Sequence, residues 1–303
     1  MSIIFGPIPS RRFGKSLGID LSPNKKQCNF DCLYCELKPA DVVSAYDDVV
    51  SVDLIMGELK KALEIHNDID IITVTANGEP TLYPYLGELV DEIDKIKESK
   101  KTLILSNGST VNDANIRYAL SKFDSVKLSL DCATDKCLKK LDRPTKGINM
   151  SDITEGMLEF RKNFTKPLII EILFVKNIND NIEEILKLNE FLLKLKPARI
   201  DISTIDRPPA YKVEALLYEE MMDISKLFDP SLPIYIAHRK KLEITKESYS
   251  DEEILKTLSS RPLSDDDIDA LFDDKSKEIF QTLLKLGKIK IINHSGVDFY
   301  KSI

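Results

Sequence analysis

The middle of this 303-residue chain alternates short apolar runs with longer segments in which apolar residues recur every three or four positions. The short runs predict β-strands, the clearest at 70–75, 102–105, 126–130, 168–175 and 199–204, with weaker ones at 17–21 and 234–237. The longer segments predict helices, among them 52–65, which Ser51 caps, and 181–196. Alternating strands and helices are typical of a parallel sheet covered by helices. Six such units predict an α/β fold, a partial (β/α)6 TIM-like barrel.

The pattern changes after about residue 249, where the apolar spacing predicts three short helices followed by a β-hairpin. The helices are expected at 251–258, at 265–272 after an N-cap at Ser264, and at 275–286 before Gly287. The hairpin strands are expected at 288–293 and 297–300, on either side of His294-Ser295-Gly296. This order predicts a winged-helix-like domain at 246–303, after a barrel domain at 1–245.

Composition and charge exclude several classes of function. The net charge is −7, and residues 251–303 carry eight Lys or Arg against eleven Asp or Glu. The charge of this tail therefore favours packing or partner contact over nucleic-acid binding. Outside the tail, Arg11-Arg12 is a candidate for a local basic patch. No apolar run reaches the roughly 18 residues of a membrane span, so no membrane partner is expected. Few and unevenly spaced cysteines favour a reducing cytoplasm.

Three of the five cysteines, Cys28, Cys32 and Cys35, lie within eight residues in the spacing C-x3-C-x2-C. Three thiols cannot pair among themselves without a remainder, so a disulfide framework is a poor explanation. Thiolates from one short loop suit zinc or iron–sulfur ligation. A [4Fe–4S] cluster held by three thiolates leaves one iron without a protein ligand, and a small molecule can bind there.

Polar residues follow five of the predicted strands. They are Asn77-Gly78-Glu79-Pro80, Ser106-Asn107-Gly108, Asp131, Lys176-Asn177 and Asp206-Arg207-Pro208-Pro209. Each alone is an ordinary set of turn formers. Because ligands gather at the carboxyl ends of parallel strands, the five sets and the cysteine loop together predict one site at that edge of the sheet.

The cysteine spacing, with Tyr34 directly before Cys35, resembles the signature of the radical S-adenosylmethionine (SAM) superfamily. Thr75-Ala76-Asn77-Gly78-Glu79-Pro80-Thr81 resembles the family's Gly-Gly-Glu-Pro strand end, with Asn77 in place of the first glycine. The resemblance implies a [4Fe–4S] cluster on the three cysteines and SAM on its open iron. It further implies a flavodoxin- or ferredoxin-type electron donor and cleavage of SAM to methionine and a 5′-deoxyadenosyl radical.

The resemblance also implies roles for individual residues. Tyr34 is expected at the adenine, and Gly78 and Glu79 at the methionine ammonium. Ser129 and Asp131 match positions near the ribose and the carboxylate. For two further residues the implied contacts are weaker: Arg143 as a cation for that carboxylate, with a surface ion pair as its alternative role, and Asn107 as a polar contact.

Within the superfamily, the segments from Phe5 to Gly14 and from Ile205 to Ala210 resemble a group related to the wyosine tRNA-base synthases. A tRNA base or a small molecule is therefore a candidate substrate. Those synthases use extra N-terminal cysteines for a second cluster, and this chain has none before Cys28. Cys132 and Cys137 are expected to be buried or half-buried thiols, and His66 and His294 are given no catalytic role.

Two other classes of function compete with a radical enzyme. The first is a binding module in which the cysteine loop holds zinc and the tail binds nucleic acid or protein. Its zinc would need a fourth ligand, such as Asp31, Cys132 or a histidine. The second is an iron–sulfur redox sensor coupled to the tail, which leaves the Asn-Gly-Glu-Pro strand end unexplained.

Overall fold

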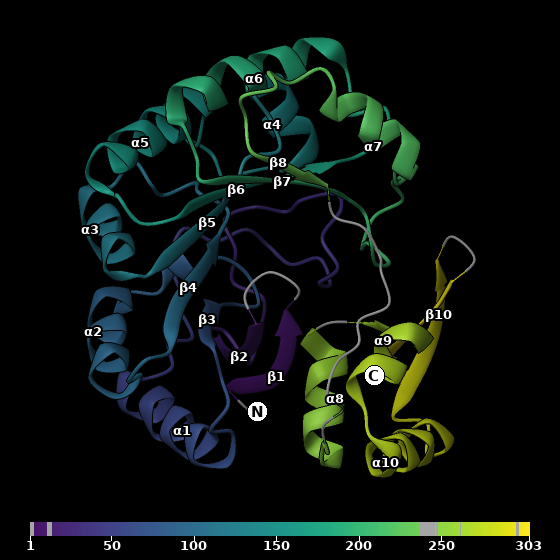
Figure 1. The fold of residues 1–303 in the computed structure, drawn as a ribbon. Coiled ribbons are helices and arrows are strands. Elements are labelled where there is room, and N and C mark those ends of the chain that lie inside the picture. The colour runs from purple at the N-terminus through teal and green to yellow at the C-terminus, as the bar shows by residue number, and fades with distance from the viewer. Residues whose placement is uncertain (1–2, 11–13, 237–245, 247, 261, 295–296) are drawn as a thin grey trace.

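The computed structural model describes residues 3–10, 14–236, 246, 248–260, 262–294 and 297–303. An eight-stranded sheet forms the larger part of the molecule, and its strands lie in the order β1 to β8. Figure 1 shows the sheet curving inside an arc of helices, with the C-terminal segment beside β1. The strands are β1 Ile4–Ser10, β2 Gly14–Asp20, β3 Ile71–Thr75, β4 Lys101–Ser106, β5 Ser125–Ser129, β6 Leu168–Phe174, β7 Arg199–Thr204 and β8 Ile234–Ile236.

Strands β2 to β8 pair in parallel, and β1 pairs antiparallel with β2. Helices follow each of the strands β2 to β7, so the predicted six β/α units and the open barrel-like sheet are confirmed. The helices are α1 Val52–Ile65, α2 Leu86–Ile96, α3 Ala114–Lys122, α4 Asp135–Leu141, α5 Met150–Asn163, α6 Ile182–Leu195 and α7 Tyr218–Ser225. Helix α1 begins after Ser51 as predicted, because the Ser51 side chain accepts a hydrogen bond from the amide of Leu54.

Strand β1 was not predicted from the sequence. It contains Pro7 and Pro9, which remove backbone donors and weaken a strand signal. Prolines are tolerated in β1 because it lies at the edge of the sheet.

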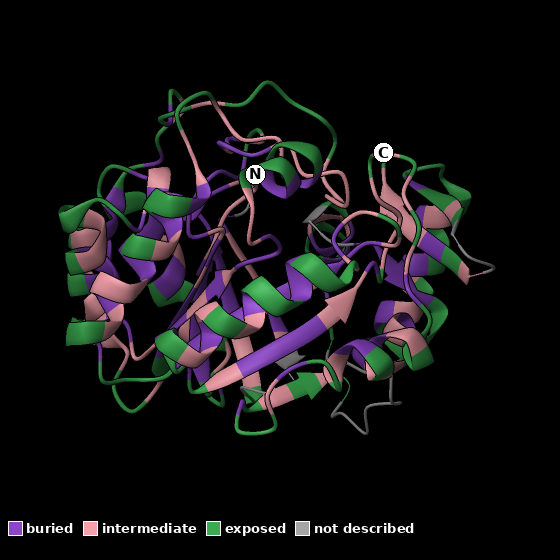
Figure 2. Ribbon diagram, turned by 90° about the horizontal axis from the view of Figure 1, so that it is seen from above, coloured by how far each residue is buried: buried purple, intermediate pink, exposed green. Residues whose placement is uncertain are grey.

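Alternate strand residues divide between a helix-packed face and a face toward the barrel interior. On β5, Val126 and Leu128 are fully buried in the large core, whereas Lys127 and Ser129 are partly exposed. On β6, Ile170 and Ile172 are likewise fully buried. Figure 2 shows buried positions along the strands and on the helix faces that cover them. Burial of this apolar face holds the strand ends in place, and the interior is left for polar chemistry.

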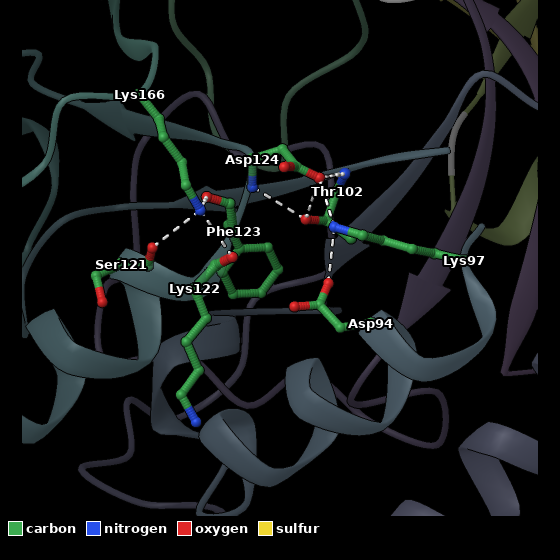
Figure 3. A network of polar contacts seen from close by, with 8 residues as sticks. All are labelled: Asp94, Lys97, Thr102, Ser121, Lys122, Phe123, Asp124 and Lys166. Carbon is green, nitrogen blue, oxygen red and sulfur yellow. Dashed lines mark hydrogen bonds and ion pairs between the residues drawn. The ribbon is translucent and has the colours of Figure 1, made fainter. Parts of the chain in front are cut away.

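A polar network ties helices to strands at the amino-terminal edge of the sheet (Figure 3). Asp124 accepts hydrogen bonds from the Nζ of Lys97 at 2.7 Å and from the amide of Thr102 at 3.0 Å. Lys97 also forms an ion pair with Asp94 at 2.7 Å. Nearby, the Nζ of Lys166 donates to the carbonyl oxygens of residues 121, 122 and 123, at the end of α3. These cations compensate a carboxylate and a helix C-terminus.

The C-terminal segment forms a second unit with its own core, which includes Ile254, Leu258, Phe272 and Phe280. Its elements are α8 Asp251–Ser260, β9 Leu263–Ser264, α9 Asp265–Leu271, α10 Asp274–Lys285, β10 Ile289–His294 and β11 Val297–Ser302. The three helices and the paired hairpin strands were predicted. The two-residue β9, which pairs with β11, was too short to predict. The hairpin turn at 295–296 and most of the expected boundary near 245 lie outside the described residues.

The C-terminal unit rests against the barrel near the cysteine loop. The hydroxyl of Tyr249 donates to the carbonyl of Pro7 at 2.6 Å, and the Nζ of Lys301 donates to the carbonyl of Glu36 at 2.9 Å. Helix α8 also places Lys256 3.9 Å from the buried carboxylate of Asp20 at the end of β2. None of the helices formed by the described residues is long and apolar enough to cross a membrane.

Candidate active site

The cysteine loop is anchored on one side to the end of β3. The amide of Gln27 donates to the carbonyl of Asn77 at 2.8 Å, and the amide of Glu79 donates to the carbonyl of Gln27 at 3.0 Å. Gly78 lies between them with φ +137°, and an added Cβ would stand 1.9 Å from the Gln27 oxygen. Only glycine fits this approach. Gly78 therefore holds the loop through its backbone, and whether it also faces an ammonium group stays a prediction.

On its other side the loop is anchored to the end of α4. The amides of Asp31 and Leu33 donate to the carbonyls of Asp142 and Leu141. Arg143 donates from Nε to the Asp31 carbonyl at 2.7 Å and forms an ion pair with the Asp31 carboxylate. Its guanidinium also lies 4.0 Å above the ring centre of Tyr211. Arg143 thus forms a partly buried ion pair with the loop, and it is not among the residues lining the cavity described below. Its predicted contact with the carboxylate of SAM stays a prediction.

The five cysteines divide into two groups. Cys28, Cys32 and Cys35 are unpaired, whereas Cys132 and Cys137 form a disulfide with their Cα atoms 5.5 Å apart. The prediction that these last two are thiols was wrong, because the turn from β5 into α4 brings them together. Cys132 is consequently not available as a fourth zinc ligand.

Hydrogen-bond donors lie beside two of the three unpaired thiols, those of Cys28 and Cys35. The Sγ of Cys28 accepts from the amide of Phe30 at 3.4 Å and faces the Nδ2 of Asn107 at 3.9 Å. The Sγ of Cys35 accepts from the Nζ of Lys26 at 3.5 Å. Burial raises the pKa of Cys28 to about 12 and that of Cys32 well above its usual value. Buried thiols of this kind ionise when a metal supplies the opposite charge.

The donor set fits an iron–sulfur cluster. Three thiols from one anchored loop match the ligand type, and the hydrogen bonds to sulfur are typical of cluster sites. Within the described residues, no three His, Cys, Asp or Glu side chains are grouped to hold a single metal ion. A cubane cluster differs from a single ion, since its iron atoms occupy separate corners and its thiolates need not converge on one point.

Glu79 is a buried hub at the ends of β3 and β4. One carboxylate oxygen accepts from the amide and hydroxyl of Thr81 and from the hydroxyl of Ser106, and the other accepts from the amide of Asn107 at 2.7 Å. The hydroxyl of Tyr46 donates to the Glu79 carbonyl at 3.0 Å. Burial raises the pKa of Glu79 although these hydrogen bonds favour its ionised form. Through these hydrogen bonds the carboxylate joins the ends of β3 and β4. The predicted contact of Glu79 with an ammonium group stays a prediction.

Asn107 connects this hub to the cysteine loop. Its Nδ2 donates to the Oδ1 of Asn29 at 2.9 Å, and its Oδ1 accepts from the hydroxyl of Ser109 at 2.6 Å. Asn29 in turn donates to Ser109 at 2.7 Å. Asn107 thus contacts the loop and the Sγ of Cys28, and its predicted polar contact with SAM stays a prediction.

A small cavity of about 20 Å³ lies between the loop and the ends of β4 and β5. It is lined by Phe30, Tyr34, Asn107, Ser129, Leu130, Asp131, Cys132, Leu138, Asp142, Met150 and Ile153. Four residues predicted for one site, namely Tyr34, Asn107, Ser129 and Asp131, therefore meet here. Gly78 and Glu79 lie beside this group but do not line the cavity.

Two buried carboxyl groups face the cavity. Asp131 accepts from the hydroxyl of Tyr34 at 2.5 Å and from the amide of Leu173 at 2.7 Å. Asp142, missed by sequence reasoning, accepts a hydrogen bond from the thiol of Cys32, and its Oδ1 has no hydrogen-bond partner among the described residues. Burial raises the pKa of both carboxyl groups. Asp142 immediately precedes Arg143, so its motif was visible although its role was not.

A larger cavity of about 490 Å³ lies between residues 81–84, 109–116 and 145–152. It shares Asn29 with the cysteine loop but contains neither a cysteine nor Asp131. The chemistry-bearing residues gather at the smaller cavity, and we place the candidate active site there.

The fold and the site define a class of enzyme, in which three thiols lie at the carboxyl ends of a partial (β/α)6 barrel. The sequence model of the radical SAM superfamily matches residues 26–189, more than half of the chain. The chain therefore belongs to the radical SAM superfamily and is a radical SAM enzyme, a class whose cofactors are a [4Fe–4S] cluster and SAM.

Relatives resemble the chain over nearly its whole length. A UPF0026 protein of Helicobacter pylori (strain J99) is 40% identical over 303 residues, which cover 99% of this chain and 97% of that protein. A UPF0026 protein of Methanocaldococcus jannaschii is 30% identical over 316 residues, with 99% and 96% covered. A structure of TYW1 with a lysine–pyruvate adduct bound aligns over 95% of this chain and 80% of that chain, with a TM-score of 0.53 and 15% identity. At that identity the likeness shows a shared fold alone.

Proposed function

We propose that Cys28, Cys32 and Cys35 hold a [4Fe–4S] cluster and that SAM binds against the wall formed by Tyr34, Ser129 and Asp131. The observation that carries the proposal is the grouping of three unpaired thiols in a loop anchored beside buried carboxyl groups. A bound cluster, once reduced, would supply the electron that cleaves SAM to methionine and a 5′-deoxyadenosyl radical. A zinc-binding module and a redox sensor are not favoured, because the superfamily is one of enzymes.

The chain's own residues bind and orient in this proposal. Burial favours the neutral forms of Asp131 and Asp142 in the empty site, and a sulfonium and an ammonium group bound beside them would favour the ionised forms. Tyr34 is fixed through Asp131 and lies ready to pack against the adenine. Gly78 and Glu79 hold the ends of β3 and β4 against the loop. In this proposal the backbone near Gly78 binds the ammonium group of SAM. Arg143 fixes the loop through Asp31.

For the substrate we propose a tRNA base or a small molecule, as the resemblance to the wyosine-related group implies. The motif from Phe5 to Gly14 supports that grouping, although Arg11, Arg12 and Phe13 lie outside the described residues. The electron donor is proposed to be of the flavodoxin or ferredoxin type, acting in the cytoplasm. The order of helices and hairpin strands in the tail supports a winged-helix-like unit that packs on the barrel or recruits a partner.

The direct test is anaerobic purification followed by iron and sulfide analysis. We expect about four irons for each chain, a brown and oxygen-sensitive absorbance, and 5′-deoxyadenosine after dithionite and SAM are added. Bound zinc without iron after anaerobic reconstitution would contradict the proposal. For the tRNA substrate, the nucleosides of cells with and without the gene are compared by mass spectrometry, and an unchanged profile removes it.

A further inference from the structure

Lys26 is a buried cation at the cysteine loop that the function described so far does not use. Only 8% of its side chain is exposed. Its Nζ lies 3.5 Å from the Sγ of Cys35, within hydrogen-bond range of a sulfur acceptor. The neighbouring Lys25 differs, since 46% of its side chain is exposed and it forms an ion pair with Asp47.

The backbone around Lys26 is fixed. The next residue, Gln27, bridges to Gly78, and its side chain accepts from the amides of residues 47 and 48 at 2.9 and 3.1 Å. Lys26 therefore points at the loop from a held position. Burying an ammonium group costs free energy unless an opposite charge compensates it.

The nearby carboxylate of Asp31 compensates Lys26 only in part. The Oδ1 of Asp31 lies 3.9 Å from the Lys26 Nζ and has no hydrogen bond among the described residues. The other oxygen, Oδ2, is held by Arg143 and by the hydroxyl of Tyr211 at 2.8 Å. Arg143 and Lys26 thus share one carboxylate, and the Sγ of Cys35 lies closer to the Lys26 Nζ than the Asp31 Oδ1 does, at 3.5 Å against 3.9 Å.

We propose that Lys26 raises the reduction potential of the cluster by donating a charged hydrogen bond to the Sγ of Cys35. The inference rests on the proposed function, in which Cys35 is an iron ligand. Hydrogen bonds to sulfur and nearby charge are two of the factors that set cluster potentials. Reduction adds one electron to the cluster and transfers no atom, so the cluster becomes more negative by one charge. A fixed cation 3.5 Å from a ligand sulfur therefore stabilises the reduced state more than the oxidised state.

Lys26 is a positioning residue in this account, because it acts through Cys35 and does not touch a substrate. The electron comes from dithionite in the experiment and from the protein donor in the cell. The advantage of the arrangement is that a weaker electron donor suffices to reduce the cluster.

The test is a spectroelectrochemical titration of anaerobically reconstituted protein without SAM. Lys26→Met should lower the midpoint potential, so that the ratio of reduced to oxidised cluster at a fixed potential falls about tenfold. Lys26→Arg keeps the charge and should stay near the wild type. Lys26→Gln keeps an N–H donor without the charge and should lie between them. Lys25→Met is the matched control, since it removes an adjacent exposed charge, and it should leave the potential unchanged.

The possible results distinguish the proposed function from the inference about Lys26. A wild-type protein that takes up no iron defeats the proposed function itself. A Lys26→Met protein with full iron content and the wild-type potential overturns this inference alone. If Lys26→Met fails to hold the cluster, Lys26→Gln replaces it, and a Gln variant with the wild-type potential overturns the inference equally.

Discussion

Carboxyl groups at the two edges of the parallel sheet differ in whether a cation compensates them: half-buried Asp124 has such a cation, and buried Asp131 and Asp142 have none in the part of the chain that the structure describes. At the amino-terminal edge, burial tends to raise the pKa of Asp124, but hydrogen bonds from Lys97 and Thr102 more than offset it and lower that pKa (Figure 3). At the carboxyl-terminal edge, burial raises the pKa of Asp131 and Asp142. Within the described residues, no Lys, Arg or His nitrogen forms an ion pair with either of these two groups.

The difference separates stability from function. A compensated carboxylate such as Asp124 stabilises the fold, whereas an uncompensated one costs stability until a cation arrives. At the carboxyl-terminal edge, Asp131 and Asp142 carry this cost in stability close to the three thiols. This edge is therefore built to receive positive charge, which iron and the sulfonium and ammonium groups of SAM would bring.

The largest expected effect is the loss of the cluster when a loop cysteine is removed. Cys32→Ala should lose most of the iron and all SAM cleavage, because the two remaining thiols leave another iron exposed. The double variant Cys132→Ser, Cys137→Ser is the matched control. It should keep the iron and lose at most about 2 kcal/mol of unfolding free energy. Iron analysis and denaturant titration check both, and retention of the cluster in Cys32→Ala would sink the ligand assignment.

Glu79→Gln should cost about 3 kcal/mol of unfolding free energy. In one orientation the Gln amide nitrogen would face the backbone amide of Asn107, and in the other it would face the donors of Thr81 and Ser106. In either case a donor in the site would lose its acceptor. Urea titration measures the loss, with the exposed Glu88→Gln as a control near zero. Equal stability of the two variants would show that Glu79 is not the hub described here.

Asp131→Asn and Asp124→Asn should have opposite profiles. Asp131→Asn should leave the apoprotein as stable as the wild type or more stable, because no cation of the described residues lies beside this buried carboxyl group to compensate its charge. It should weaken SAM binding about tenfold, because it removes a carboxyl group that the positive charge of SAM would ionise. Asp124→Asn should cost about 1 kcal/mol and leave SAM binding unchanged. Calorimetry of SAM binding together with urea titration tests the pair, and identical profiles would remove the contrast between the two edges.

The same pair differs in its dependence on pH. A group whose native pKa is raised binds more protons in the native state, so its contribution falls as pH rises above the ordinary carboxyl pKa of 3.8. For Asp124 the native pKa is lowered, and its contribution is lost as pH falls below that value. Stability curves of the apoprotein should therefore lose part of their decline between pH 3.8 and about 7 in Asp131→Asn, and part of their decline below pH 3.8 in Asp124→Asn. An unchanged decline between pH 3.8 and about 7 in Asp131→Asn would contradict the first assignment.

The smallest effect is expected at Lys166, on the surface of the amino-terminal edge. Lys166→Met removes a cation that binds three carbonyls at the end of α3 and should cost about 0.5 kcal/mol. SAM binding should not change. Melting temperatures of the two proteins measure the effect, and a change in SAM affinity would show that the two edges are coupled.

Much of this site could be predicted from the sequence because its signals are local. The spacing of Cys28, Cys32 and Cys35 and the polar ends of β3 to β5 are visible in short windows. The apolar periodicity of 52–65 and its cap at Ser51 predicted α1 with its observed bounds. These features depend on neighbouring residues and on the direction of a parallel strand.

Contacts that form only in the folded chain could not be predicted in the same way. The disulfide between Cys132 and Cys137 depends on the turn from β5 into α4, and the ion pair between Arg143 and Asp31 joins residues more than a hundred positions apart. The hydrogen bonds to Glu79 were not predicted, because the hydroxyl of Ser106 and the amide of Asn107 reach it only in the folded sheet. Lys26 and Asp142 flank visible motifs, but their burial is a property of the fold.

The central claim is that the carboxyl-terminal edge holds a cluster with an iron open to SAM. Electron paramagnetic resonance of the dithionite-reduced protein, recorded before and after SAM is added, tests it most directly. We predict a reduced [4Fe–4S] signal that SAM alters in the wild type, and that SAM alters less at equal concentration in Asp131→Asn. A reduced protein with no cluster signal, or with a signal that saturating SAM leaves unchanged, would contradict the account.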